Sequence, residues 1–196
     1  MTLAQPVDVD RADGPALRRV RTPVALVERL DDAAAVLALR SRRLPGWDRA
    51  MYLASACGDD GRIWIAAAAF EAARVRSPRR FAVLVGALAA ESVVVNLGIK
   101  KVARRPRPAG VTEHEFWLRI PTDTSFPSGH AASSALMAVL LSERSPFAPV
   151  WVALAAGIGA SRVPVGVHHG SDVVAGWAVG AAMAAALRST GITRRR

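Results

Sequence analysis

The chain is 196 residues long, which is enough for one domain and too short for two hydrophobic cores of useful size. Hydrophobic residues make up 52% of it, charged residues 21%, and the formal net charge is +10 at pH 7. Because the apolar residues come in runs and the charges in clusters, we expect a membrane protein with an anionic partner, such as a phosphate group or an anionic lipid. Nucleic acid is the weakest candidate and is not expected, since no recognition motif accompanies the arginines.

A single cysteine, Cys57, excludes an internal disulfide and a cysteine-based zinc site. We expect it to be a small buried residue. Residues 1–13 are polar and acidic and lack the pattern of a cleavable signal peptide, so the chain's own apolar segments are expected to place it in the membrane.

The N-terminal 40 residues predict a tail and one helix. Residues 1–22 have the composition of a disordered lead, and we expect their basic cluster to be solvated. Over residues 24–40 apolar side chains recur at helical spacing, which predicts an amphipathic helix on the membrane surface and not a span. These apolar positions are Val27, Leu30, Ala34, Leu37 and Ala38, and the basic cluster is Arg18, Arg19 and Arg21.

A second short helix is predicted over residues 47–56, after the break at Leu44-Pro45-Gly46. Trp47 and Tyr52 are amphipathic aromatic residues of the kind that collects at the membrane interface. We expect both to be interface anchors.

Five apolar runs follow, and we expect each to be a membrane-spanning helix. Only the second has the length that the hydrocarbon layer requires. Runs of about 12 to 15 residues also suit buried helices, so a soluble helical bundle stays open as an alternative. The five runs are residues 62–75, 81–99, 130–141, 147–160 and 173–187.

Three features favour the membrane over a soluble bundle. Small residues recur four positions apart, the spacing that lets lipid-embedded helices touch. Arginines stand at the ends of the runs and barely enter them. The alanine-rich runs also lack the amphipathic stripe that a small soluble bundle needs. The small-residue pairs are Gly86 with Ala90, Ala156 with Ala160, and Gly176 with Gly180.

Two carboxylates belong to the first two runs. Glu71 precedes Arg74 by three residues, and we expect the two to pair near the interface. Glu91 lies inside the second run, where a carboxylate is a candidate functional group. The favoured alternative is a hydrogen bond between Glu91 and a serine, such as Ser133 or Ser134, on a neighbouring helix.

Three polar segments carry the chemistry, all on one side if the helices alternate in direction. The first, residues 100–108, holds five cations in eight residues, and its prolines keep Arg107 in a fixed direction. The second, residues 125–130, offers Ser128 as an N-cap and free amides at Gly129 and His130. Such amides form an anion site at a helix start.

The third segment, residues 161–172, contains Arg162 and places His168 four residues before Asp172 at the start of an apolar helix. Positions four apart share a helix face, so Asp172 can accept a hydrogen bond from one ring nitrogen and leave the other facing outward. A histidine held in this way is either a metal ligand backed by a carboxylate or a nucleophile or base with a fixed tautomer.

The zinc alternative lacks a third ligand, because His169 points away from His168 and His114 lies in a loop. The three segments supply three cations, helix-start amides and two histidines, a set that suits a tetrahedral oxyanion. We therefore predict a reaction without metal or cofactor, in which cations and amides stabilise charge on a phosphoryl group. The three cations are Lys100, Arg107 and Arg162.

Together the segments resemble the signature of the type 2 phosphatidic acid phosphatase (PAP2) superfamily. That signature reads Lys-x6-Arg-Pro, Pro-Ser-Gly-His and Ser-Arg-x5-His-x3-Asp. All of its fixed residues are present in the right order. They stand here as Lys100 to Arg107-Pro108, Pro127-Ser128-Gly129-His130, and Ser161-Arg162 to His168 and Asp172.

The resemblance implies a role for each position. His168 would attack phosphorus in line and form a phosphohistidine, with Asp172 fixing its tautomer. His130 would be the general acid that protonates the leaving oxygen and later helps to activate water. The phosphate oxygens would be held by Lys100, Arg107, Ser128, Gly129 and Arg162.

The fold implied is all-α, an integral membrane bundle of the PAP2 type with five spans and N-terminal interfacial helices. The resemblance covers residues 48–188 as the phosphatase domain, between an N-terminal region, 1–47, and a basic tail, 189–196. The family core has six helices, so an N-terminal helix is expected to complete it or to lie in the interface. Five spans would place the site on the cytoplasmic face of a bacterial plasma membrane, and a sixth would reverse this.

A lipid phosphate is the implied substrate, as a phosphomonoester or diphosphate of a prenyl or glycerolipid, with a prenyl carrier as the leading candidate. The loop 109–124 is expected to form the rim of the site, because it is rich in aromatic residues. Two other classes of function stay open. One is an enzyme like the vanadate-dependent haloperoxidases, and the other is a non-catalytic lipid-binding membrane protein.

Overall fold

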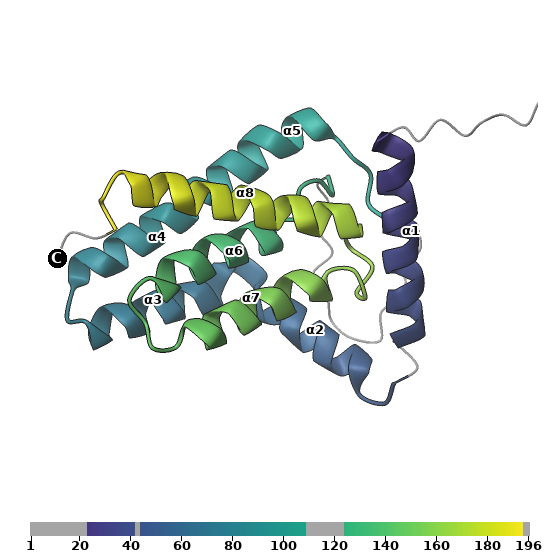
Figure 1. Ribbon diagram of the computed structural model, residues 1–196. Coiled ribbons are helices and arrows are strands. Elements are labelled where there is room, and N and C mark those ends of the chain that lie inside the picture. The colour runs from purple at the N-terminus through teal and green to yellow at the C-terminus, as the bar shows by residue number, and fades with distance from the viewer. Residues whose placement is uncertain (1–22, 42–43, 109–123, 194–196) are drawn as a thin grey trace, which may run out of the picture.

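The structure is a computed structural model that describes residues 23–41, 44–108 and 124–193 (Figure 1). Every regular element in these residues is helical, which confirms the all-α prediction. The elements are α1 (Pro23–Ser41), α2 (Trp47–Cys57), the 3₁₀ turn η1 (Asp59–Gly61), α3 (Arg62–Arg74), α4 (Pro78–Ser92), the π-helical η2 (Val93–Ile99), α5 (Lys100–Ala103), α6 (Gly129–Ser142), α7 (Ala148–Ser161) and α8 (Gly170–Ser189).

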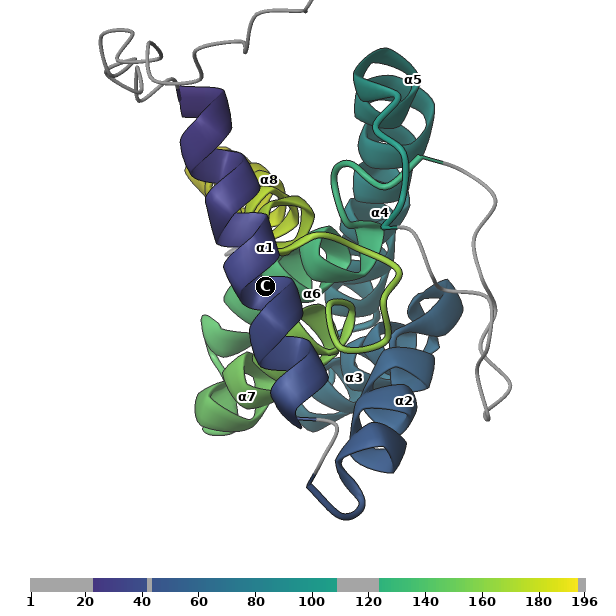
Figure 2. The ribbon, with the colours of Figure 1, turned by 90° about the vertical axis from the view of Figure 1, so that its right-hand side faces the viewer.

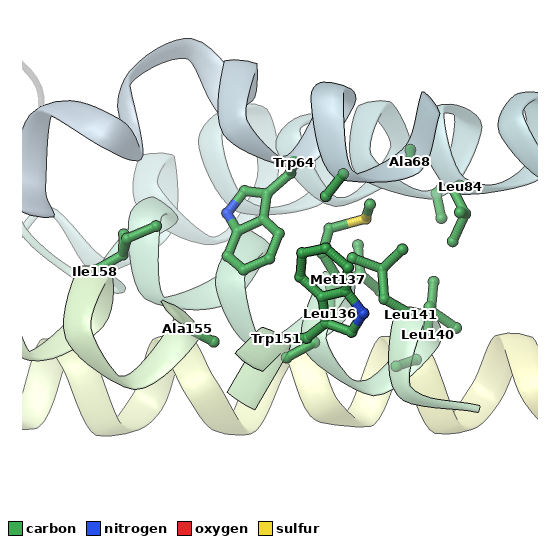
Figure 3. Close-up of a cluster of buried hydrophobic side chains, with 14 residues drawn as sticks. Trp64, Ala68, Leu84, Leu136, Met137, Leu140, Leu141, Trp151, Ala155 and Ile158 are labelled. Carbon is green, nitrogen blue, oxygen red and sulfur yellow. The ribbon is translucent and has the colours of Figure 1, made fainter. Parts of the chain in front are cut away.

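The helix α6 is the centre of the bundle, packed against α3, α4, α7 and α8. Helix α1 lies across one end of the bundle, against α8 (Figures 1 and 2). Large apolar side chains from α3, α4, α6 and α7 fill the core (Figure 3). The largest of those that are fully buried are Trp64, Leu84, Leu136, Met137, Leu140, Leu141 and Ile158.

All five predicted runs form helices, but their lengths differ. Among the described residues, two continuous helical stretches are long and apolar enough to cross a membrane, 26 residues over Pro78–Ala103 and 20 over Gly170–Ser189. Helices α6 and α7 are apolar but have only 14 residues each. A helix of that length rises about 21 Å, against about 30 Å of hydrocarbon. The five spans therefore stay a prediction.

Helix α8 crosses α6 at very short range through two glycines. A Cβ atom on Gly180 would lie 2.0 Å from the carbonyl oxygen of Ala132, and one on Gly176 would lie 2.4 Å from that of Ser128. The predicted role of this small-residue pair is therefore confirmed. The other two pairs are exposed, so they do not bring helices together within the part of the chain that is described.

The N-terminal helices are present, but two details predicted for them are wrong. Tyr52 packs into a small buried cluster with Val165 and Val167, because α2 turns this face toward the segment that follows α7. It therefore cannot anchor the interface. Cys57 is exposed at the last turn of α2. In α1 the large apolar side chains face away from the bundle, which is compatible with the predicted position on the membrane surface; Leu37, for example, is 69% exposed.

Of the two predicted carboxylate contacts, one is present. Arg74 Nη2 lies 2.7 Å from Glu71 Oε2, as the spacing indicated. Glu91 is buried, but within the described residues its Oε1 and the hydroxyl of Ser134 have no hydrogen-bond partner. The hydroxyl of Ser133 donates 2.9 Å to the carbonyl of Gly129 on its own helix. The predicted hydrogen bond between Glu91 and a serine is therefore wrong. Ser133 donates its hydroxyl within its own helix instead, and Ser134 does not bond to Glu91.

The close crossing of α6 and α8 predicts that Gly180→Ala destabilises the protein. The added methyl group would overlap backbone atoms that cannot rotate away, which costs about 1–3 kcal/mol. We expect a lower melting temperature in detergent. The matched control is Gly86→Ala, because no described atom lies within 4 Å of a Cβ placed there. It should leave the melting temperature unchanged or raise it, since alanine has the higher helix propensity. Equal melting temperatures for the two variants would contradict the assigned packing.

Candidate active site

The ends of the helices that carry the predicted site residues meet at the end of the bundle that α1 covers (Figures 1 and 2). At this end α5 stops, α6 and α8 begin and α7 finishes. Hydrogen bonds connect the first polar segment to the third and the second to the third. The three segments therefore hold one another in position.

The first segment is held along its length by the residues that precede α6. Thr124 Oγ1 donates 3.2 Å to the carbonyl of Lys100, and Ser125 N donates 2.9 Å to the carbonyl of Arg105. Arg107 Nη2 donates 3.3 Å to the carbonyl of Thr124. These bonds keep the basic residues in place after the helix ends, and Lys100 itself is buried.

Arg107 joins the first segment to the third. Its Nη1 donates 2.7 Å to the carbonyl of Val167 and lies 3.3 Å from His168 Nε2. A guanidinium group therefore stands directly in front of the ring nitrogen that the sequence predicts to be reactive. That position is suited to an anion bound between the two.

The start of α6 connects the second segment to the third. Ser128 Oγ accepts a hydrogen bond of 3.4 Å from the amide of Ala131, which confirms Ser128 as the N-cap. The amide of Ser128 donates 3.0 Å to the carbonyl of Asp172. Helices α6 and α8 therefore begin side by side, with Gly129 in the first turn of α6.

His168 is 3% exposed, and its second ring nitrogen faces Asp172. The distance from Nδ1 to Asp172 Oδ2 is 3.6 Å, which is longer than a hydrogen bond, and no other described group bonds to Nδ1. The expected bond is therefore not formed. One reason is that Asp172 Oδ2 already accepts 2.9 Å from the amide of His169, and Oδ1 accepts 2.7 Å from Arg105 Nη1.

Burial strongly favours the neutral ring of His168. Burial lowers its pKa to about 4, in the same direction as the charges of Arg162 and Arg107, and the carboxylate of Asp172 only partly opposes this. The imidazole is therefore neutral at pH 7. A neutral imidazole has the lone pair that a nucleophile requires.

Arg162 is a fully buried cation behind the histidines. Its Nη1 donates to Ser55 Oγ, while Nε and Nη2 find no hydrogen-bond partner among the described residues. Burial lowers the pKa of Arg162 to about 10, which still leaves it charged at pH 7. Two buried donors without partners are a strong attraction for an oxyanion.

His130 is held by residues that the sequence did not single out. Its Nε2 lies 2.9 Å from Asp59 Oδ1 of η1. A Cβ atom on the preceding Gly58 would lie 2.6 Å from Cδ2 of the same ring. The junction between α2 and η1 therefore packs on His130, so an N-terminal helix contributes to the site. The one feature of the sequence that could have indicated this contact is the turn-forming stretch Gly58-Asp59-Asp60-Gly61.

Arg105 and Asp31 were also missed as site residues. Arg105 bonds to Asp172 through Nη1, at 2.7 Å, and to Asp31 through Nη2, at 2.6 Å. Arg105 was one of the five cations of the first segment, but Asp31 is not one of the apolar positions on which the prediction of α1 was based. The predicted rim, including its aromatic residues, lies outside the described residues, as does the N-terminal basic cluster.

Nothing in the described ranges brings together three side chains of histidine, cysteine, aspartate or glutamate that could hold a metal ion.

Comparison with known proteins gives a consistent result. The family model of the PAP2 superfamily matches residues 80–196, which include all three segments. The decaprenylphosphoryl-5-phosphoribose phosphatase of Mycobacterium tuberculosis (strain ATCC 25618 / H37Rv) is 34% identical over 136 residues, 68% of this chain and 74% of that protein. The undecaprenyl-diphosphatase of Sulfolobus acidocaldarius is 38% identical over 95 residues, 45% of each protein.

One solved structure shares the fold. It is a transmembrane PAP2 type phosphatidylglycerolphosphate phosphatase from Bacillus subtilis, which superposes with a TM-score of 0.66. The likeness covers 91% of this chain and 90% of that one, at 19% sequence identity. The arrangement of helices is therefore common to both proteins.

The low pKa of His168 predicts a loss of stability in acid. An unfolded histidine takes up a proton near pH 6.5, but this buried ring does so only near pH 4. Between these values only the unfolded state is protonated at this position, so this group alone lowers the free energy of unfolding by up to about 1.4 kcal/mol per pH unit as the pH falls. From pH 7 to pH 5, wild type should therefore lose more stability in detergent than His168→Gln. Equal losses would contradict the buried, neutral ring.

Proposed function

Since the chain belongs to the PAP2 superfamily, we propose that it is a membrane lipid phosphatase in which His168 carries the phosphoryl group as a phosphohistidine. That the protein is a phosphoric monoester hydrolase follows from the family match and from the phosphatases among its relatives. The observation that carries the mechanistic part is the 3.3 Å approach of Arg107 to His168 Nε2. This distance supports the proposal, because a cation beside a neutral, buried imidazole would hold a phosphoryl group within reach of the ring nitrogen.

In the first step, the Nε2 lone pair of His168 attacks phosphorus, and the bond from phosphorus to the ester oxygen breaks. Arg107 Nη1 exchanges its contact with the ring for one with a phosphoryl oxygen. Lys100, Arg162, the hydroxyl of Ser128 and the helix-start amide of Gly129 hold the remaining oxygens. Since most of these donors are fixed before the reaction, they stabilise the developing charge with little rearrangement.

His130 is the general acid of this step and donates its proton to the leaving oxygen of the lipid alcohol. The contact of 2.9 Å with Asp59 keeps the ring on the side of the site formed by η1. In the second step, the now neutral His130 takes a proton from water, and the water oxygen attacks phosphorus. The bond between phosphorus and nitrogen breaks, inorganic phosphate leaves and both histidines return to their starting state.

Asp172 stabilises the positive charge that His168 acquires in the phosphorylated state. Its oxygen Oδ2 lies 3.6 Å from Nδ1, so a small rotation of the ring converts this ion-pair distance into a hydrogen bond. The carboxylate then fixes the proton on Nδ1 and leaves Nε2 to phosphorus, the same logic by which an aspartate orients the histidine of a catalytic triad.

A prenyl phosphate is the proposed substrate. Two relatives are named for prenyl-linked substrates, one a decaprenylphosphoryl-5-phosphoribose and the other an undecaprenyl diphosphate. We place the protein in a bacterial plasma membrane with the five apolar helices across it, so that the lipid tail lies along the bundle and the phosphate enters at the end covered by α1. The apolar, outward-facing side of α1 suits the boundary of the membrane at that end.

The central prediction is that His168→Gln abolishes phosphate release, by about a thousandfold or more, because the nucleophile is lost. The assay measures inorganic phosphate released by purified protein in detergent with EDTA, from a prenyl phosphate, phosphatidic acid and phosphatidylglycerol phosphate. The prenyl phosphate should be hydrolysed fastest. Thermal unfolding must show that the variant is folded.

Other outcomes would favour the competing functions. Phosphate release that survives in folded His168→Gln would exclude the proposed nucleophile. A wild-type protein that binds lipid phosphates without hydrolysing any would be a lipid-binding protein. Oxidation of bromide in the presence of vanadate and peroxide would indicate a haloperoxidase.

A further inference from the structure

Arg105 connects two buried carboxylates that come from distant parts of the chain. One guanidinium nitrogen bonds to Asp172 Oδ1 at 2.7 Å and to Ser171 Oγ at 2.6 Å. The other bonds to Asp31 Oδ2 at 2.6 Å. Arginine can bridge two carboxylates in this way because its donors form a rigid fork, whereas a lysine is a single point charge.

Asp31 also caps the helix that carries Asp172. Its Oδ1 accepts 2.7 Å from the amide of Ser171, and its Oδ2 accepts 2.8 Å from the hydroxyl of the same residue. Asp31 is 6% exposed. Burial alone would raise its pKa, but the bonds from Arg105 and Ser171 lower it, so the carboxylate stays charged at pH 7.

The docking of α1 on α8 depends on the polar contacts of Asp31, because the apolar face that α1 buries is small. A Cβ atom on Gly170 would lie 3.0 Å from Cβ of Ala34, so the helices are close at this point. The larger apolar side chains of α1, such as Leu30 and Leu37, face outward. The buried face therefore consists of Asp31 with small residues, among them Ala34 and Ala38.

Two of the arginines of the first segment, Arg105 and Arg107, act on opposite sides of the same histidine. Arg107 faces the reactive nitrogen of His168, at 3.3 Å. Arg105 instead holds the far oxygen of Asp172, which leaves Oδ2 turned toward Nδ1 of the ring. Without Arg105, that carboxylate would keep one strong partner, the amide of His169, and could rotate about it.

We propose that Asp31 and Arg105 are positioning residues that fix the orientation of the Asp172 carboxylate against His168. Helix α1, which lies outside the family match of residues 80–196, is then part of the catalytic unit. The proposal rests on the proposed role of His168 as nucleophile. It adds that the N-terminal helix contributes to the rate of reaction and not only to stability.

The test is a double-mutant cycle of Asp31→Asn and Arg105→Gln, with phosphate release from the preferred lipid phosphate as readout. Each single variant should lower kcat about tenfold while KM changes less than about twofold, because the misplaced group acts on the nucleophile and not on lipid binding. The double variant should be no slower than the slower single variant, since both changes break one link. The matched control is Asp32→Asn, an exposed carboxylate on the same helix, which should retain the wild-type kcat.

Two results would overturn the proposal. One is a folded Asp31→Asn protein with the kcat of Asp32→Asn, even if its melting temperature is lower, because Asp31 would then only attach α1. The other is a double variant about a hundredfold slower than wild type, because independent losses multiply.

His168→Gln is assayed in parallel to separate this proposal from the proposed function. If that variant is inactive and Asp31→Asn is fully active, only the positioning role fails. If His168→Gln remains active, the phosphohistidine mechanism fails and the positioning role fails with it.

Discussion

The site depends on the close contact between the first turns of α6 and α8. Glycines at 176 and 180 let the two helix backbones approach so closely that no side chain would fit between them. At the same end the amide of Ser128 donates to the carbonyl of Asp172. This contact places a helix start with free amides beside the aspartate and histidine of the next motif. A phosphate held by those amides is therefore within reach of the imidazole.

The same end of the bundle concentrates positive charge that is shielded from water. Arg162 is fully buried, and two of its nitrogens have no hydrogen-bond partner in the part of the chain that the structure describes, while Arg107 stands against a neutral His168. Burying a cation without full charge compensation costs free energy, and binding of an oxyanion would relieve this cost. Burial is the main reason that the imidazole of His168 stays unprotonated, and the charges of Arg162 and Arg107, which attract the phosphate, lower its pKa further.

The sequence predicted what is local and missed what is distant. The helices followed from apolar runs, and the pairing of His168 with Asp172 followed from a spacing of four, although the found distance is longer than a hydrogen bond. The contact between Asp31 and Arg105 joins residues 74 positions apart, and that between Asp59 and His130 joins residues 71 apart. The spacing of apolar residues along the sequence gives no information on contacts between residues so far apart. In α1 the apolar pattern predicted a helix on the membrane surface, but nothing in it indicated that Asp31 and small residues would pack against α8.

The most direct measurement is to trap the enzyme after a short incubation with lipid phosphate labelled in the phosphoryl group, and to map the label by mass spectrometry under alkaline conditions. A phosphohistidine is predicted on His168 alone. It should disappear when the incubation is prolonged until the substrate is exhausted. Label on His130 or on another residue, or phosphate release at full rate with no covalent label at the shortest times, would contradict the account.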